Sequence, residues 1–389
     1  MSAQRKILYL FVLLIWFPAA VAAPALIPAP PAIAAKGYLL MDANSGTVLV
    51  EKNADERLEP ASLTKMMTSY VADYELAQGN IALDDITTVS KNAWAKNFPG
   101  SSLMFLEVGK KVSVENLLKG VIISSGNDAT VALAEHIAGS TSAFTDIMNQ
   151  HAELLGMFDT QFRNPHGLPK EGHYTTARDM ATLGRAIIRD FPAQYGYYSQ
   201  KSYTFNGIKQ LNRNKLLWRD DSVDGLKTGH TSRAGYCLVA SAKKDDMRLI
   251  AVVMGAKSEE SRAREAQKLL SYGFRYYKTL KLYDEGEMVQ KVKVWAGDKE
   301  ELALVTEDDV YITVPRAQKD DVDARMEIDQ FIEAPVEAGK TYGELVIGVG
   351  EDEPLMKVPL VASSTVESGG FVQVIWDKIQ LFFYQMLEG

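Results

Sequence analysis

The chain has 389 residues, of which 47% are hydrophobic and 24% are charged, so it can bury a sizeable core and has the length for two domains. Its net charge of −8 and its pI near 5.4 give no basic surface of the kind that follows phosphate backbones, so no nucleic acid is expected as a partner. Five scattered histidines without paired metal-ligand spacing and a single cysteine, Cys237, predict no metal site, no cofactor and no internal disulfide.

The N-terminus has the layout of a secretory signal peptide. Two basic residues precede an apolar run at residues 7–17, and small residues follow, with a predicted cleavage site after Ala22. The alternative is a retained membrane-spanning helix, but the run is shorter than the ~20 residues that a span needs, and Pro18 follows it. We therefore expect residues 1–22 to be removed and the mature protein to work outside the cytoplasm.

The next part of the chain predicts one mixed α/β domain over residues 37–278, preceded by an extended, proline-rich lead-in at 23–36. Two apolar runs around the turn sequence ANSG predict a β-hairpin at its start. Apolar spacing of i, i+3 and i+4 dominates from about residue 62 to 190 and predicts a helical block. Strand patterns and then an amphipathic helix follow at 203–211, 235–244, 247–256 and 261–277. The sheet is therefore expected to be built from both ends of a segment whose middle is helical.

The pattern changes at residue 279. Short alternating strands with turn residues between them predict a small all-β domain over 279–361, and 362–370 has the composition of a flexible linker. Residues 371–389 predict an amphipathic helix with a very wide apolar face. This helix could dock on the β domain, but its position beyond a linker and its bulky aromatic residues favour lying in a membrane interface. Lys378 is its only cation, so attraction to anionic lipid is expected to be weak.

Ser62 and Lys65 form an S-x-x-K motif at a predicted helix start, just after Pro60. Residues three apart share a helix face, so the two side chains are expected to touch. A hydroxyl needs a nearby base to act as a nucleophile, and a lysine of lowered pKa can serve. Alone the motif is weak, because capping serines followed by lysines are common.

Two further motifs change that assessment. The stretch SSGNDA at 124–129 offers Ser125 and Asn127 between two helical segments, and LKTGHT at 226–231 supplies Lys227, Thr228 and Gly229 on or before a strand. The order S-x-x-K, S-x-N, K-T-G is the motif set of penicillin-binding proteins and class A β-lactamases.

With these motifs the chain resembles the serine DD-carboxypeptidases among the low-molecular-mass penicillin-binding proteins, the type 5/6 family. The stretches PASLTKMMTSYV, GSSLMFL, TTARDMA, FNGIKQLNRN, VDGLKTGHT and KLLSYGFRYY carry the same resemblance, which spans nearly the whole chain. It implies a β-lactamase-like transpeptidase fold with an antiparallel sheet and a helical subdomain, then a small β domain and a C-terminal amphipathic helix. It also implies attachment to the periplasmic face of the cytoplasmic membrane through residues 371–389.

The resemblance further implies an activity and its residues. Ser62 would attack the carbonyl of the penultimate D-alanine in a peptidoglycan stem peptide, with Lys65 as the base, and β-lactam antibiotics would acylate the same serine. Ser125 would relay protons between Lys65, Lys227 and the leaving amine, and Asn127 would bind the substrate backbone.

The remaining implied roles concern substrate binding. Thr228 would bind the terminal carboxylate beside the positive Lys227, and the small Gly229 would let substrate lie along the strand edge. Backbone N–H groups of Ser62 and His230 would form the oxyanion hole. Arg262 aligns with the family's carboxylate-binding arginine, with Arg264 as the alternative. His166 could be a turn residue or could manage the hydrolytic water.

Three other interpretations stay open. A β-lactamase would form the same acyl-serine, but no E-x-x-x-N element lies between the second and third motifs, where the chain reads NPHGLPKEG. A DD-endopeptidase acting on crosslinked peptides would use the same residues. A non-catalytic module that binds peptidoglycan or the membrane is the alternative from another class.

Overall fold

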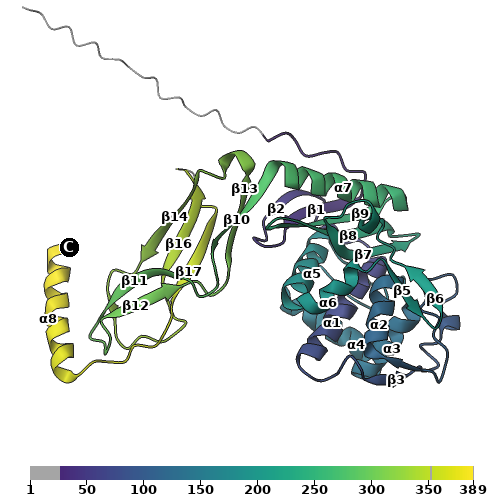
Figure 1. Cartoon of the computed structure of the whole chain (residues 1–389), viewed down its shortest axis with the longest axis horizontal. Coiled ribbons are helices and arrows are strands. Elements are labelled where there is room, and N and C mark those ends of the chain that lie inside the picture. Colours follow the sequence, from purple (N-terminus) through teal and green to yellow (C-terminus); the bar gives the residue numbers. More distant parts are fainter. Residues whose placement is uncertain (1–26, 351–352, 389) are drawn as a thin grey trace, which may run out of the picture.

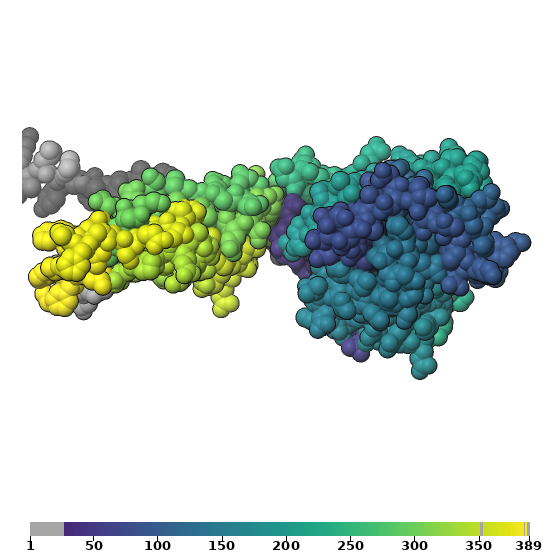
Figure 2. Space-filling model, turned by 90° about the horizontal axis from the view of Figure 1, so that it is seen from below, coloured from purple at the N-terminus to yellow at the C-terminus, as the bar shows by residue number. Residues whose placement is uncertain are grey.

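The computed structural model describes residues 27–350 and 353–388 and shows two domains and a terminal helix (Figure 1). The predicted signal peptide, 1–22, lies outside the described residues. The β domain extends from one side of the large α/β domain, so the molecule is elongated (Figure 2).

The large domain is built around a five-stranded antiparallel sheet in the order β2-β1-β9-β8-β7. Its strands are β1 (Gly37–Asp42), β2 (Val48–Lys52), β7 (Val223–Thr231), β8 (Gly235–Lys244) and β9 (Met247–Ala256). The first two strands precede the helical block and the other three follow it, which confirms a sheet built from both ends of the segment. The strand pattern at 203–211 does not join this sheet and forms the separate hairpin of β5 (Ser202–Phe205) and β6 (Ile208–Leu211). The helix α7 (Glu259–Tyr276) packs on one face and α5 (Ala177–Asp190) on the other, so the central strands are buried on both sides.

The predicted helical block is confirmed. It lies below the sheet in Figure 1 and surrounds a second apolar core. Its elements are η1 (Ala61–Leu63), α1 (Thr64–Ala77), β3 (Ile86–Thr88), η2 (Ala95–Asn97), β4 (Lys111–Ser113), α2 (Val114–Lys119), η3 (Gly120–Ser124), α3 (Asn127–Ala138), α4 (Thr141–Leu154), α6 (Pro192–Tyr195), η4 (Gly196–Ser199), β5 (Ser202–Phe205), β6 (Ile208–Leu211) and η5 (Lys215–Trp218). Side-chain caps begin two of the longer helices. The hydroxyl of Ser140 accepts a hydrogen bond from the backbone N–H of Ala143, and that of Thr176 accepts one from Asp179.

The β domain has its own core. A two-stranded pair β10-β13 and a six-stranded sheet in the order β14-β16-β17-β12-β11-β15 enclose it. The strands are β10 (Tyr277–Tyr283), β11 (Met288–Trp295), β12 (Glu301–Val305), β13 (Val310–Pro315), β14 (Val322–Ile328), β15 (Ile332–Glu333), β16 (Thr341–Val349) and β17 (Met356–Ala362), with the short helix η6 (Arg316–Gln318) after β13.

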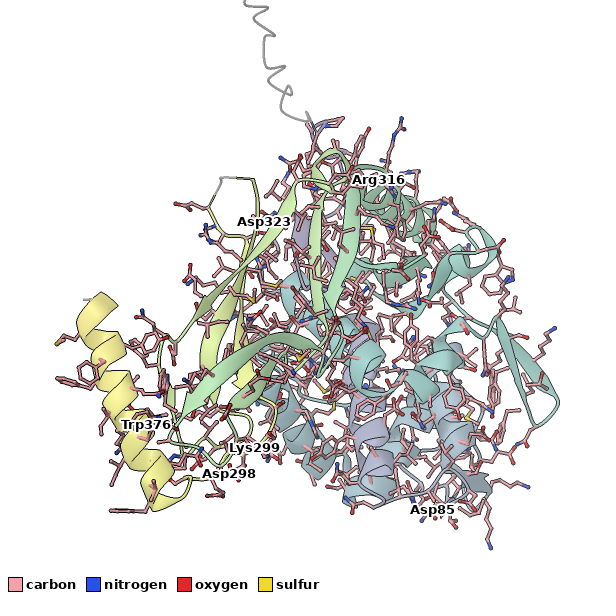
Figure 3. All side chains as sticks on the ribbon, turned by 60° about the vertical axis from the view of Figure 1, so that its left-hand side comes forward. Asp85, Asp298, Lys299, Arg316, Asp323 and Trp376 are labelled. Atoms are coloured by element: carbon pink, nitrogen blue, oxygen red, sulfur yellow. The ribbon has the colours of Figure 1, made fainter. Side chains whose placement is uncertain are left out.

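Polar contacts join the two domains. The Thr279 hydroxyl donates to a carboxylate oxygen of the buried Asp42 at 2.6 Å, and the hydroxyls of Ser45 and Thr313 lie 2.7 Å apart. Arg316, labelled in Figure 3, donates to the carbonyl of Phe274 at the end of α7. The β domain is thus held against the first hairpin and the last helix of the large domain.

The prediction of a flexible linker at 362–370 is wrong. Val366 is fully buried in the β-domain core and pairs with Val336, and Ser368 forms a bridge with Gly297. The composition is rich in glycine and serine, but one valine buried among the strands outweighs it. The segment is an ordered edge of the β domain.

The terminal helix α8 (Phe371–Glu388) begins directly after this edge and contacts the β domain along a narrow stripe. The Asp377 carboxylate accepts from the Ala296 N–H at 3.0 Å, Gln373 donates to the Gly297 carbonyl at 2.9 Å, and Leu381 is buried. Apolar side chains elsewhere on the helix are exposed: Phe371, Val372, Ile375, Trp376, Ile379, Phe382, Phe383, Tyr384 and Met386. Trp376, on this helix, is labelled in Figure 3. Among the residues that the structure describes, no helix combines the length and apolar character needed to cross a bilayer.

Candidate active site

Ser62 and Lys65 meet as their spacing predicts. Ser62 lies in the single turn η1 that leads directly into α1, and Lys65 lies in the first turn of that helix. The distance from Lys65 Nζ to Ser62 Oγ is 3.2 Å. Lys65 is fully buried, whereas Ser62 remains partly exposed and can be reached by a substrate.

The surroundings of Lys65 Nζ suit a base. It donates to Asn127 Oδ1 at 2.7 Å and to the carbonyl oxygen of His166 at 2.6 Å. Both partners can only accept, so they require two N–H groups of the lysine. The third position of the nitrogen faces Ser62, and in the neutral amine this position carries the lone pair. The geometry therefore directs the lone pair of a neutral Lys65 at the Ser62 hydroxyl.

Burial brings the pKa of Lys65 down from its usual 10.5 to about 7. The carboxylate of Asp128 opposes the shift, and the guanidinium of Arg213 adds to it. A lysine with this pKa is a mixture of charged and neutral forms near neutral pH, which is the range in which a general base works best.

Ser125 lies beside the second lysine of the site. A π-helical turn, η3, ends at Ser124, and the next residue, Ser125, has a left-handed backbone with φ 59°. This turn directs its hydroxyl to Lys227, whose Nζ donates to Ser125 Oγ at 2.9 Å. Burial and the neighbouring charge of Lys65 hold the pKa of Lys227 well below its usual value. Lys65 itself bonds Ser62, Asn127 and His166, so its link to Ser125 is through neighbours and not direct.

The K-T-G motif lies on the edge strand β7. Thr228 and Lys227 are buried, whereas His230 is exposed and its ring stacks on Tyr236 with centroids 4.0 Å apart. A Cβ on Gly229 would lie 2.9 Å from the carbonyl oxygen of Pro60. The turn η1, which carries Ser62, packs so closely on β7 that only a glycine fits at position 229. From the sequence, this glycine was expected only to leave room for the substrate.

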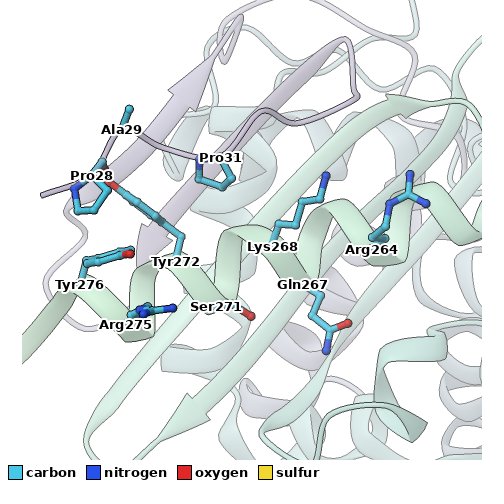
Figure 4. Close-up of a pocket in the computed structure, with 10 residues that line it drawn as sticks. All are labelled: Pro28, Ala29, Pro31, Arg264, Gln267, Lys268, Ser271, Tyr272, Arg275 and Tyr276. Atoms are coloured by element: carbon cyan, nitrogen blue, oxygen red, sulfur yellow. Dashed lines mark hydrogen bonds between the residues drawn. The ribbon is translucent and has the colours of Figure 1, made fainter.

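The structure separates the two candidate arginines. Arg262 is 5% exposed, and its Nη1 donates to the carbonyl oxygen of Gly229 at 3.1 Å. Arg264 pairs with Glu265 at 3.1 Å and lines a groove between α7 and the lead-in, among residues that include none of the motif residues (Figure 4). In that groove Tyr272 Oη donates to the Pro28 carbonyl at 2.9 Å, so the lead-in is packed onto α7. Arg262 is therefore the arginine that the fold brings to the K-T-G strand.

Arg213 was missed in the sequence. It follows β6, its side chain is exposed, and its charge lowers the pKa values of Lys65, Lys227 and Arg262 together. It makes no ion pair with any residue in 27–350 or 353–388. The signal available was its position in the family-like stretch FNGIKQLNRN, to which no role had been given.

The loop 162–173 packs against η1, the turn that carries Ser62, and positions it. A Cβ on Gly167, which has φ +85°, would lie 1.8 Å from the Ala61 carbonyl oxygen. The Arg163 N–H donates to His173 Nδ1 at 2.9 Å, so the proton is on Nε2, which donates to the Thr64 hydroxyl at 2.9 Å. Burial lowers the pKa of His173 to about 4, so the ring stays neutral at neutral pH.

His166 serves the site through its backbone. Its carbonyl oxygen accepts from Lys65, while its ring Nδ1 accepts from the Leu168 N–H at 3.2 Å. Burial and the charge of Lys65 lower the pKa of the ring to about 3. The imidazole is therefore neutral at neutral pH, and its Nδ1 is occupied by the turn.

Comparisons with known proteins agree with this geometry. A family model described as D-alanyl-D-alanine carboxypeptidase matches residues 25–258, and a model described as penicillin-binding protein 5, C-terminal domain, matches residues 277–368. The carboxypeptidase DacA of Haemophilus influenzae is 46% identical over 355 residues, which is 90% of either chain. The carboxypeptidase DacC of Escherichia coli is 44% identical over 390 residues, 99% of this chain and 96% of the relative. The crystal structure of penicillin binding protein 5 from Haemophilus influenzae superposes with a TM-score of 0.83 at 46% identity, covering 88% of this chain and 100% of that one.

Proposed function

Because the chain belongs to the D-alanyl-D-alanine carboxypeptidase family and is a serine carboxypeptidase that removes the terminal D-alanine of peptidoglycan stem peptides, we propose that Ser62 is its nucleophile and Lys65 the general base. The observation that carries this assignment is the coordination of Lys65 Nζ. Two acceptors occupy its N–H groups, and the remaining direction faces Ser62 Oγ at 3.2 Å. No other direction is left for the lone pair of the neutral amine.

Acylation starts when Ser62 Oγ attacks the carbonyl carbon of the penultimate D-alanine and its proton moves to Lys65 Nζ. The backbone N–H groups of Ser62 and His230 stabilise the oxyanion, and such donors typically contribute ~3 kcal/mol each. The C–N bond then breaks, and the amine of the terminal D-alanine leaves with a proton from Ser125. Ser125 regains a proton from Lys227, whose Nζ donates to its hydroxyl at 2.9 Å, and Lys65 keeps the proton of Ser62 until the acyl-serine is hydrolysed. Water hydrolyses the acyl-serine by the reverse proton path, and the same serine is acylated by penicillins.

Substrate binding depends on the positive charge around β7. The substrate carboxylate lies by the Thr228 hydroxyl and favours the protonated form of Lys227, since an anion raises the pKa of a nearby lysine. Arg262 supports substrate binding in two ways: it donates a hydrogen bond to the Gly229 carbonyl and so positions β7, and it adds positive charge near the substrate carboxylate. Arg213, exposed and without an ion pair among the described residues, is the guanidinium best able to reach the carboxylate directly. Asn127, held between Lys65 and the Ser101 hydroxyl, borders the substrate backbone.

The enzyme is exported and is held on the periplasmic face of the cytoplasmic membrane by α8. The support is the exposed apolar surface of this helix, which includes Trp376 at 60% and Phe382 at 62% exposure. Insertion into the bilayer interface would remove these aromatic side chains from water, and the burial of their apolar surface favours binding. The contacts of Gln373 and Asp377 with the β domain hold the helix by a different part of its surface.

The assignment of Ser62 is tested with a fluorescent penicillin and a D-Ala-D-Ala peptide. Wild-type protein is expected to carry the label on the peptide that contains Ser62 and to release D-alanine, whereas Ser62→Ala loses both activities. Ser142→Ala, at an exposed serine of α4, is the matched control and keeps both. Label on another serine, or D-alanine release by Ser62→Ala, contradicts the assignment.

Membrane attachment is tested by vesicle flotation of the full chain and of a chain lacking residues 371–389. The full chain is expected to float and the shortened chain to stay soluble with its peptidase activity intact. Phe382→Asp weakens flotation, whereas Gln380→Ala does not. Flotation of the shortened chain contradicts the proposal.

A further inference from the structure

A polar cavity lies next to the catalytic site, between the helix α4 and the loop 162–173. Its volume is about 460 Å³, within the range of ~300–1,000 Å³ that is usual for small-molecule sites. One wall is the part of α4 from Thr141 to Asn149, and the other is the loop between Phe162 and Lys170. Most of the side chains in these walls carry hydroxyl, amide or charged groups, so the cavity is suited to a hydrophilic ligand.

The cavity borders the active site at the loop and not at the K-T-G strand. The turn η1, which carries Ser62, packs against both β7, at Gly229, and the loop, at Gly167. In the loop, His166 lines the cavity with its side chain and accepts from Lys65 with its carbonyl oxygen. The lining includes no residue of β7. The terminal carboxylate of the substrate is bound at β7, so the loop is available to the part of the substrate that precedes the scissile bond.

Hydrogen bonds fix both walls of the cavity. On α4, Asn149 binds both backbone groups of Phe162: its Nδ2 donates to the carbonyl oxygen at 3.1 Å, and its Oδ1 accepts from the N–H at 2.8 Å. In the loop, Asn164 Oδ1 accepts from the Gly167 N–H at 2.7 Å, and its Nδ2 donates to the Leu168 carbonyl at 2.9 Å. The cavity is therefore formed before a ligand arrives, and little ordering opposes binding.

Two charged side chains in the walls are free to bind a ligand. Asp146 on α4 and Arg163 on the loop are exposed, and the side chain of neither forms an ion pair or a hydrogen bond with any residue that the structure describes. Lys170 adds a second cation, which donates to the Arg163 carbonyl at 3.3 Å. An anion would be repelled by Asp146, and a cation by Arg163 and Lys170. A neutral ligand that both donates and accepts hydrogen bonds can use the carboxylate and the guanidinium together.

We propose that this cavity binds the glycan strand of peptidoglycan, at the N-acetylated sugar that carries the stem peptide. This proposal rests on the proposed function of Ser62, because the peptide that Ser62 cleaves is joined to that sugar. In the intact substrate the acid group of the sugar is in amide linkage to the peptide, so the sugar is neutral. Its hydroxyls donate to the Asp146 carboxylate, and its hydroxyl and acetamido oxygens accept from the Arg163 guanidinium.

The length of the stem peptide fits this placement. In a pentapeptide, four residues lie between the sugar and the scissile bond, and four extended residues span up to about 14 Å. Ser62 Oγ and the His166 carbonyl oxygen both contact Lys65 Nζ, so only two hydrogen bonds separate the nucleophile from the loop that lines the cavity. A chain of this length can run from Ser62 past the loop to the cavity.

The test measures release of D-alanine by the full chain from two substrates, a free pentapeptide and the same pentapeptide attached to its disaccharide. Wild-type protein is expected to show a kcat/KM about tenfold higher on the glycosylated substrate, because the cavity adds hydrogen bonds to a part of the substrate that does not react. Asp146→Ala and Arg163→Ala should each lose most of this advantage and change kcat/KM on the free pentapeptide less than twofold.

The matched control is Glu153→Ala, at an exposed carboxylate of the same helix that does not line the cavity. This variant should keep the full advantage of the glycosylated substrate. All three variants should take up a fluorescent penicillin at the wild-type rate, because a penicillin carries no sugar.

The outcomes separate the two proposals. If wild-type protein uses both substrates equally well, the glycan proposal is refuted and the carboxypeptidase assignment stands. If Asp146→Ala and Arg163→Ala lower kcat/KM on both substrates equally, these side chains position the loop and do not bind sugar. An equal loss in Glu153→Ala would show a general effect of charge and would also refute the proposal. If wild-type protein neither releases D-alanine nor takes up a penicillin label, the proposed function of Ser62 itself fails.

Discussion

The pH dependence of acylation should reveal the buried lysine directly. Only neutral Lys65 can accept the proton of Ser62, so the acylation rate constant should follow the neutral fraction of Lys65. With a pKa of about 7, that fraction is about 10% at pH 6, about 50% at pH 7 and about 90% at pH 8. A lysine with its ordinary pKa would be only ~0.3% neutral at pH 8.

The measurement is the second-order rate constant for labelling by a fluorescent penicillin between pH 5.5 and 9.5. We expect a rise of about tenfold from pH 6 to 8, which is the ratio of the two neutral fractions, and a plateau above pH 8. A continued rise of about tenfold per pH unit up to pH 9.5 would show that Lys65 keeps an ordinary pKa, and it would refute the argument from burial.

A substitution checks the sign. The positive charge of Arg213 lowers the pKa of Lys65, so Arg213→Gln should raise that pKa and move the midpoint of the profile to higher pH. Arg219→Gln is the matched control, because Arg219 is paired with Glu260 and is not among the charges that shift Lys65. An unchanged midpoint in Arg213→Gln, or an equal shift in the control, contradicts the assigned electrostatics.

Three further changes test the supporting structure. Gly167→Ala forces a Cβ into the Ala61 carbonyl, so it should lower the free energy of unfolding by more than about 3 kcal/mol or abolish penicillin labelling. The control Gly79→Ala, at a residue with φ +71° and open space around it, should lower the free energy of unfolding by only ~1 kcal/mol. Equal losses in thermal or urea unfolding would refute the clash. Asp73 is buried without a hydrogen-bond partner among the described residues, and burial raises its pKa, so the folded state keeps a proton that the unfolded state releases. Stability should therefore fall as pH rises above the unfolded pKa of 3.8, and the advantage of Asp73→Asn should widen by up to about 1.4 kcal/mol per pH unit; a constant difference from pH 4 to 7 would contradict this. Val366→Ala should destabilise the β domain by about 1–2 kcal/mol and leave D-alanine release unchanged, and no loss of stability would return the segment to the status of a free linker.

Much of the architecture could be predicted because it follows from local patterns. Alternation and turn residues indicated the hairpins β1-β2 and β8-β9, and apolar spacing indicated the helical block. The contact between Ser62 and Lys65 was predictable for the same reason, since a separation of three residues on a helix is a distance that the backbone sets by itself.

Composition was a poor guide where one side chain made the difference. The Gly/Ser-rich stretch at 362–370 predicted flexibility, but Val366 enters a core formed by strands up to about 70 residues earlier in the chain. The sequence also left open whether Arg262 or Arg264 faces the K-T-G strand. They lie about 200° apart around a helix, so only the docking of α7 on the sheet decided which one faces Gly229.

The sequence by itself determined which chemical groups the site contains, because the three motifs carry the hydroxyls, amines and amide that acyl transfer needs. Only the tertiary structure decided their protonation and their partners. The pKa of Lys65 depends on exclusion of water by α3, the loop 162–173 and β7, and on the charges of Asp128 and Arg213, which are distant in the chain. Desolvation and Coulomb interactions act through space, so they appear only after folding has brought these segments together.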